Sequence, residues 1–206
     1  FHSDTVQSMA YFPLTAKLPV DFMVASAHKF RGPKGVGFLY RREEVAVPSL
    51  ITGGGQERNQ RAGTENITGI IGMAAAFEKA TRTMQERTQH LRNLKETFRT
   101  KLKDLHADIC FNGPTETDPA LPGVLNVSFP MLDPDSMLLF QLDMHQISAS
   151  GGSACTSGSV QGSHVLKGIG CPDRNAATAI RFSFGAQNTL AEIDYVIEKL
   201  RLILQL

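Results

Sequence analysis

The stretch Ser26-Ala27-His28-Lys29-Phe30-Arg31-Gly32-Pro33-Lys34-Gly35 decides the fold of this chain. It follows an alternating apolar run, Val20, Phe22 and Val24, which predicts a buried strand that delivers Lys29 to a glycine-rich turn. A lysine nucleophile must be held at a fixed point and partly desolvated, so that its amine can be neutral. We therefore predict that Lys29 forms a Schiff base; the alternative is a solvated loop lysine.

Composition and charge exclude several classes of protein. The chain has 206 residues, 42% of them hydrophobic, and 21 Lys and Arg against 20 Asp and Glu. This balance gives no basic field for nucleic acid or a membrane surface, and no apolar stretch approaches the roughly 18 residues that span a bilayer. We expect a soluble, cytoplasmic protein with no nucleic-acid or membrane partner. Because residue 1 is Phe and a strand end follows at once, we also expect the chain to begin in mid-domain, as part of something longer.

The apolar patterns predict an α/β fold with a partial large domain over residues 1–80 and a small α+β domain over residues 81–206. In the first domain, short runs at 20–27 and 35–41 predict neighbouring strands in a sheet covered on both faces. One or two helices at 66–105 lead into the second domain. There we expect strands at 124–129, 147–150 and 180–184, and helices at 136–144, near 164–167 and from 190 to the end.

Capping residues predict where two helices of the second domain begin. Asp133 or Asp135 is expected to cap the helix at 136–144. Thr189 is expected to cap the last helix, with Glu192 completing a capping box. The apolar stripe of that helix, which starts at Leu190, is expected to face the core.

Several polar residues of the first domain are candidates for binding an anionic, electron-withdrawing cofactor. Asp4 and Gln7 lie three apart past a strand end, where a carboxylate suits a pyridinium nitrogen, although an Asp in a turn more often caps it. Ser26 and His28 flank Lys29 and could contact a phosphate or shuttle protons; each alone is more often structural. The segment 53–66 combines glycines, arginines and Thr64, which is anion-binding chemistry.

Two residues of the second domain are candidates for acting on a substrate. Cys155 lies in Ser-Gly-Gly-Ser-Ala-Cys-Thr-Ser-Gly-Ser, residues 150–159, a polar loop in which a thiol is accessible, so it is the predicted nucleophile. Cys110 and Cys171 are expected to be structural, and the three cysteines are too far apart for a disulfide framework or a zinc site. Arg181 is a charge inside an apolar strand, where it binds either a substrate carboxylate or a structural partner.

Together these motifs resemble the cysteine desulfurases, pyridoxal-phosphate enzymes of the class V aminotransferase family with fold type I architecture. The resemblance covers essentially the whole chain, through 26–35, 53–66, 153–157 and 181–183. It implies that this chain is a C-terminal portion of such an enzyme. It also implies pyridoxal 5'-phosphate as cofactor, L-cysteine as substrate, a homodimer, and a protein sulfur acceptor such as an iron-sulfur scaffold.

The resemblance also implies a role for each candidate. Lys29 would carry the cofactor as a Schiff base, and Cys155 would take the sulfur of cysteine as a persulfide, releasing alanine. The remaining roles are Asp4 on the pyridine nitrogen, Gln7 on the phenolic oxygen, Ser26 and His28 on the phosphate, Thr64 on the phosphate of the other subunit, and Arg181 on the substrate carboxylate.

Alternative functions remain open at this point. A class V aminotransferase or a selenocysteine lyase would keep Lys29 and Arg181, but would leave Cys155 without a clear purpose. A non-catalytic interaction module that keeps the motifs without a complete pocket is a third possibility, because the isolated chain is expected to be inactive. No metal is expected.

Overall fold

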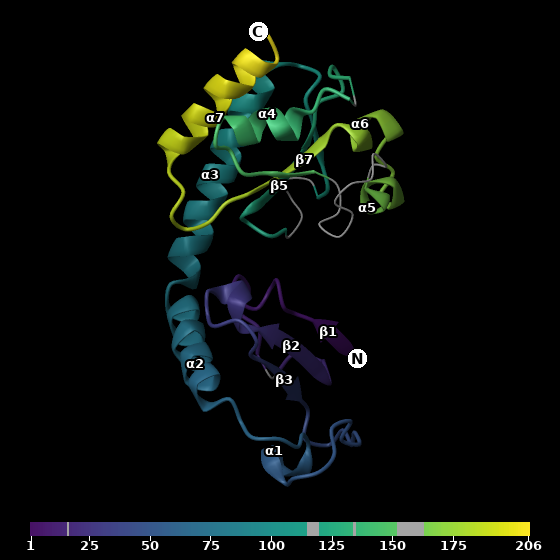
Figure 1. The fold of residues 1–206 in the computed structure, drawn as a ribbon, viewed down its shortest axis with the longest axis vertical. Helices are drawn as coiled ribbons and strands as arrows, with labels where there is room; N and C mark the ends of the chain where they lie inside the picture. The colour runs from purple at the N-terminus through teal and green to yellow at the C-terminus, as the bar shows by residue number, and fades with distance from the viewer. Residues whose placement is uncertain (16, 115–119, 134, 152–162) are drawn as a thin grey trace. The chain divides into compact units, whose positions relative to one another are not determined.

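The chain folds as two compact units, and each is described by itself. The computed structural model describes residues 1–15, 17–114, 120–133, 135–151 and 163–206. The first unit is Phe1–Glu86 and the second is Arg87–Leu206 (Figure 1). Among the described residues, none of the helices has the length and apolar character needed to cross a membrane.

The first unit is built on a three-stranded sheet. Its strands are β1 (His2–Asp4), β2 (Phe22–Ser26) and β3 (Gly37–Arg41), in the order β1-β2-β3. β1 runs parallel to β2, and β3 pairs antiparallel with β2, which confirms the two predicted neighbouring strands. A short 3-10 helix, η1 (Ala27–Phe30), follows β2 directly.

One face of this sheet is covered by helix α2 (Ile67–Arg82). The ring of Phe77 on α2 packs against Phe30 and Phe38, with ring centroids 5.5 Å and 5.9 Å apart. On the opposite face Leu39, which pairs with Val24, stays 58% exposed. The expectation of a sheet covered on both faces is therefore wrong for the described residues, because α2 packs on one face and no second layer covers the other.

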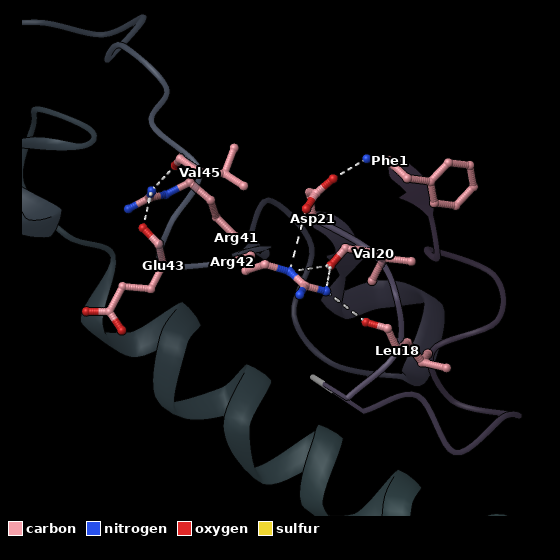
Figure 2. Close-up of polar contacts among 8 residues, drawn as sticks. All are labelled: Phe1, Leu18, Val20, Asp21, Arg41, Arg42, Glu43 and Val45. Carbon is pink, nitrogen blue, oxygen red and sulfur yellow. Dashed lines mark hydrogen bonds and ion pairs between the residues drawn. The ribbon is translucent and has the colours of Figure 1, made fainter.

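Arg42 fixes the chain where it enters β2. Its guanidinium donates hydrogen bonds to the carbonyl oxygens of Leu18 (3.1 Å) and Val20 (2.9 Å) and lies 3.5 Å from the Asp21 carboxylate (Figure 2). Guanidinium groups suit this task because their donors form a rigid fork. The strand that leads to Lys29 is thus anchored at its start.

The second unit is an antiparallel sheet with helices on both faces. Its elements are α3 (Met84–Leu105), which begins at the end of the first unit, β4 (Cys110–Asn112), β5 (Val124–Ser128), α4 (Leu138–Met144), β6 (Ser150–Gly151), α5 (His164–Gly168), α6 (Asp173–Ala177), β7 (Ala179–Ser183) and α7 (Leu190–Ile203). The strands lie in the order β4-β5-β7-β6, and every neighbouring pair is antiparallel. Helices α3 and α7 pack on one face, while α5 and α6 lie over the other, where Leu166 and Ala176 pack against Ala179.

Phe98 on α3 lies at the centre of this unit's core. Its side chain is 1% exposed, and its ring meets those of Phe182 and Phe184 edge to face, at 4.9 Å and 5.8 Å between centroids. Because side chains alternate along a strand, burying Phe182 against α3 turns Arg181 toward the opposite face of the sheet. The core thus sets the direction of a predicted site residue.

Two expectations for the region around α4 are wrong. The helix begins at Leu138 without a side-chain cap, because the Asp133 carboxylate instead accepts the Asp135 amide (2.9 Å) in the preceding turn. The strand expected at 147–150 is shorter and begins at Ser150. Ile147, where the strand was expected to begin, is instead held to the end of α4 by a hydrogen bond from its amide to the Leu142 carbonyl (2.9 Å).

The start of α7 confirms the predicted capping box. The Glu192 amide donates to the Thr189 hydroxyl, and the Thr189 amide donates to the Glu192 carboxylate at 2.6 Å. This second bond holds the pKa of Glu192 below its usual value. The apolar stripe is narrower than expected, because Leu190 is 47% exposed while Ile193 and Leu200 are buried.

Candidate active site

The predicted cofactor-binding residues of the first unit lie at one edge of its sheet. Asp4 ends β1, and Ser26 ends the parallel neighbour β2. The carboxyl ends of parallel neighbours share an edge, and in open α/β sheets ligands bind outside that edge. Gln7 follows in the turn after β1, and His28 and Lys29 follow β2 in η1.

Helix η1 explains how Lys29 is presented. Residues three apart lie on the same side of a 3-10 helix, and here Ala27 and Phe30 are both buried. His28 and Lys29, which lie between them, are both exposed. The local geometry therefore buries the two apolar residues of Ala-His-Lys-Phe and turns the imidazole and the amine outward.

The turn after Lys29 is held tightly against α2. The Gly32 amide donates to the Ala27 carbonyl (2.8 Å), and a side chain at Gly32 would meet the Ala76 methyl group of α2 at 3.2 Å. A side chain at Gly72 of α2 would come within 2.7 Å of the Pro33 ring. Glycine is thus needed on both sides of a close contact, which fixes the backbone that carries the amine.

Asp4 takes part in a turn and keeps acceptor capacity. Its Oδ1 accepts the Val6 amide at 3.0 Å, the turn-forming role that the sequence left open. The neighbouring Thr5 is buried, and its hydroxyl donates to the Val24 carbonyl at 2.6 Å, which ties this turn to β2. A carboxylate has about four acceptor positions, so the Val6 bond leaves room for a ligand donor.

The glycine- and arginine-rich segment forms an exposed turn with unusual backbone geometry. Glu57, Arg58 and Asn59 are consecutive residues with positive φ (49°, 55° and 64°). The Gly63 amide donates to the Gln56 side chain at 3.1 Å, so the segment folds back on itself. Thr64 is exposed, and in the part of the chain that the structure describes no hydrogen bond ties it to the Lys29 turn.

Arg181 of β7 lines a cavity of about 890 Å³ in the second unit. Its Nε atom is buried, and among the described residues it has neither a hydrogen-bond acceptor nor a carboxylate partner. The structural salt bridge that the sequence left open therefore has no partner in the described part of the chain. The cavity is lined by Phe111, Asn112, Gly113, Pro114, Asn126, Ser163, Val165, Leu166, Ile169, Gly170, Cys171 and Arg181.

Asn112 and Asn126 also line the cavity, and the sequence alone did not indicate either of them. Asn126 and Arg181 each lie between buried apolar residues of their strands, and Asn112 ends a partly buried strand, so the period of two could have placed all three on one face. An isolated Asn in a strand carries little signal, however, because its partners come from strands far away in the sequence.

Cys171 is among the residues that the structure describes, whereas Cys155 lies outside the described residues. The thiol of Cys171 donates to the Asn112 Oδ1 atom at 3.3 Å. Burial raises the pKa of Cys171, and the nearby Cys110 raises it further, so this thiol stays protonated. In the described residues no group of three or more His, Cys, Asp or Glu side chains is placed to hold a metal ion.

The chain belongs to the class-V aminotransferase family, whose model matches residues 1–196. It is 42% identical over 206 residues to a protein of Clostridium botulinum named cysteine desulfurase IscS, covering all of this chain and 52% of that protein. It is 38% identical over 206 residues to the cysteine desulfurase IscS of Methanosarcina thermophila, covering 100% of this chain and 50% of that protein. The chain thus spans about half the length of the curated relatives it matches.

Solved structures support the same grouping. A NifS-like protein superposes with a TM-score of 0.86 and 38% identity, over 99% of this chain and 52% of its own. A structure of SspA in complex with cysteine has a TM-score of 0.65 and 28% identity, over 92% of this chain and 51% of its own. These likenesses confirm the predicted α/β architecture of fold type I.

Proposed function

We propose that this chain is part of a cysteine desulfurase that removes sulfur from L-cysteine, giving L-alanine and a persulfide on Cys155. The observation that carries the proposal is the outward presentation of Lys29 by η1, at the edge where Asp4 ends the parallel neighbouring strand. Its relatives in the same family bear the name cysteine desulfurase, and SspA is described in complex with cysteine.

The residues at this edge suit pyridoxal 5'-phosphate. They offer an exposed amine, a carboxylate with acceptor capacity left, and hydroxyl and imidazole donors beside them. When bound, the cofactor supplies an electron sink for bonds at the substrate α-carbon. The residues proposed to hold it are Lys29, Asp4 at the ring nitrogen, Gln7 at the phenolic oxygen, Ser26 and His28 at the phosphate, and Thr64 at the phosphate bound by a second subunit.

Each residue of the chain then has a proposed task. Lys29 moves protons at the substrate α-carbon, and His28 assists as a proton shuttle. Arg181 binds the α-carboxylate through its guanidinium group. The Cys155 thiolate attacks the substrate sulfur: a sulfur–sulfur bond forms, the carbon–sulfur bond breaks, and its electron pair passes to carbon, which takes up a proton to give alanine.

The proposal extends to assembly and partners. A role for Thr64 at a neighbouring active site requires a homodimer, which its exposure allows. A persulfide must be passed on, so we propose a protein acceptor such as an iron-sulfur scaffold, in the cytoplasm.

The experiment uses the full-length protein incubated with L-cysteine. We expect equal amounts of alanine and transferred sulfur, with the persulfide located on Cys155 by mass spectrometry. Lys29→Ala should abolish the absorbance of the bound cofactor, whereas Lys79→Ala, at an exposed position on α2, should not. Cys155→Ala should keep the absorbance and lose the persulfide. An aminotransferase would stay active in Cys155→Ala, and that result would refute the desulfurase proposal.

A further inference from the structure

Three polar residues form a row across the sheet of the second unit. Asn112 of β4 pairs with Asn126 of β5, and Asn126 pairs with Arg181 of β7. Directly paired residues in an antiparallel sheet share a face, with their Cβ atoms about 5 Å apart. All three line the same cavity, so the row forms part of its polar wall.

The hydrogen bonds in this wall run in one direction and saturate Asn112. The Cys171 thiol donates to its Oδ1 atom, while its Nδ2 atom donates to the Asn126 Oδ1 atom and to the Ser128 hydroxyl, both at 2.7 Å. Ser128 is fully buried, and its hydroxyl donates a hydrogen bond to the Asn175 carbonyl oxygen at 2.7 Å. Since every donor here has its acceptor, the amide of Asn112 has a single favourable orientation.

Asn112 thereby orients its neighbour Asn126. With its oxygen bound by Asn112, the amide of Asn126 carries its two N–H donors on the side away from β4, and β7 with Arg181 lies on that other side. In the described part of the chain, the buried Nε atom of Arg181 meets no acceptor. The partly buried Asn126 amide lies beside it on the paired strand. A buried donor without an acceptor is costly, so the Arg181 Nε atom, with the Asn126 amide beside it, suits a ligand that brings acceptors.

The cavity lining indicates the charge of that ligand. None of the described residues that line it is Asp or Glu. A guanidinium and an amide beside each other, with no carboxylate from the described lining to neutralise the guanidinium charge, suit a small anion with two oxygens in one plane.

We propose that Asn126 is a second ligand-binding residue for the substrate α-carboxylate, beside Arg181, and that Asn112 is the positioning residue that fixes its amide. This inference rests on the proposed function for the identity of the ligand as an amino acid. Arg181 supplies the charge, and Asn126 selects for an acceptor oxygen at a fixed place beside it.

The test uses full-length, cofactor-loaded protein and two probes, L-alanine and L-alaninamide, which lacks the carboxylate. Calorimetric titration gives the Kd of each. Asn126→Asp still accepts the bond from Asn112 but replaces the two donors with a negatively charged oxygen. We expect it to raise the Kd of L-alanine about tenfold or more, with little change for L-alaninamide. Asn126→Ala should act in the same direction, and Asn93→Ala, at an exposed position on α3, should change neither.

Asn112→Asp tests the positioning role. Its new oxygen would face the oxygen of Asn126, so the Asn126 amide should turn over and present its own oxygen to the ligand. We expect a loss of L-alanine affinity similar to that of Asn126→Asp, and a raised KM for L-cysteine with kcat much less affected. Circular dichroism checks that each variant is folded, and the Asp variants keep the shape of the wild-type side chain if Asn126→Ala does not fold.

Three outcomes would overturn the inference: wild-type protein that does not bind L-alanine, a folded Asn126→Asp that binds it as wild type does, or equal losses for both probes. A wild-type protein that releases no alanine from L-cysteine would instead contradict the proposed function. In that case the titrations would still decide the role of Asn126, because L-alanine binding requires no sulfur chemistry.

Discussion

Replacing Phe98 with Ala should loosen the sheet that carries Arg181. The ring is 1% exposed and meets two other rings edge to face, at 4.9 Å and 5.8 Å between centroids. A buried Phe→Ala change costs about 3–5 kcal/mol, and each aromatic pair adds about 0.5–1.5 kcal/mol beyond its buried area. We therefore expect Phe98→Ala to lower the free energy of unfolding by about 4–5 kcal/mol, in the upper part of the range for buried Phe→Ala changes. Phe140, 54% exposed on α4, is the matched control and should cost less than about 1 kcal/mol.

Urea unfolding followed by circular dichroism measures the loss of stability, and hydrogen exchange of the β7 peptide measures it locally. Since each 1.4 kcal/mol is a factor of ten, a loss of about 4 kcal/mol should speed exchange that occurs through unfolding of this unit by about a thousandfold. If Phe98→Ala and Phe140→Ala had similar effects, the assignment of Phe98 as the centre of this core would be wrong.

Two further predictions concern the two parts of the candidate site. Gly37→Ala should destabilise the first unit by about 1–3 kcal/mol and weaken cofactor binding, because the new methyl group would overlap the Ala25 carbonyl just before η1; Gly168→Ala, with open space around it, is the control for thermal unfolding. Cys171 should react with iodoacetamide more slowly in the folded chain than in urea at pH 8.5, because burial raises its pKa. The folded thiol holds its proton more tightly, so the stability from this group is present below the unfolded thiol pKa and is lost as pH rises through the folded one. Equal alkylation rates measured by mass spectrometry would contradict that direction.

The sequence predicted most of the elements because their signals are local. The alternating run before Lys29, the helical period at 66–105 and the capping pair Thr189 and Glu192 all depend on residues a few positions apart. The cap of α4 was missed because Asp133 had two local uses for its carboxylate, and sequence does not show which one prevails. The uncovered face of the first sheet was missed because an apolar run such as 35–41 is typical of a strand buried on both faces, whereas in the described residues α2 covers one face and Leu39 on the other stays exposed.

The residues of the candidate site also differ in how far the sequence predicted them. Lys29 and its neighbours were found from a motif that is contiguous in the chain, and the 3-10 spacing of Ala27 and Phe30 explains their exposure. The wall formed by Asn112, Asn126 and Arg181 was not found as a set, because its members come from three strands. The sequence identified Arg181 as a charge in an apolar strand but said nothing of its neighbours.

By itself, then, the sequence determined which short segments form strands and helices, and which residue in the first unit is presented as a free amine. These outcomes depend on φ/ψ preferences and on side-chain spacing within a single turn or strand. Only the tertiary structure decided that Asn126 lies beside Arg181, whose buried Nε atom meets no acceptor among the described residues. Strand order and register are set by packing between distant segments, with Phe98 against Phe182 on one face of the sheet.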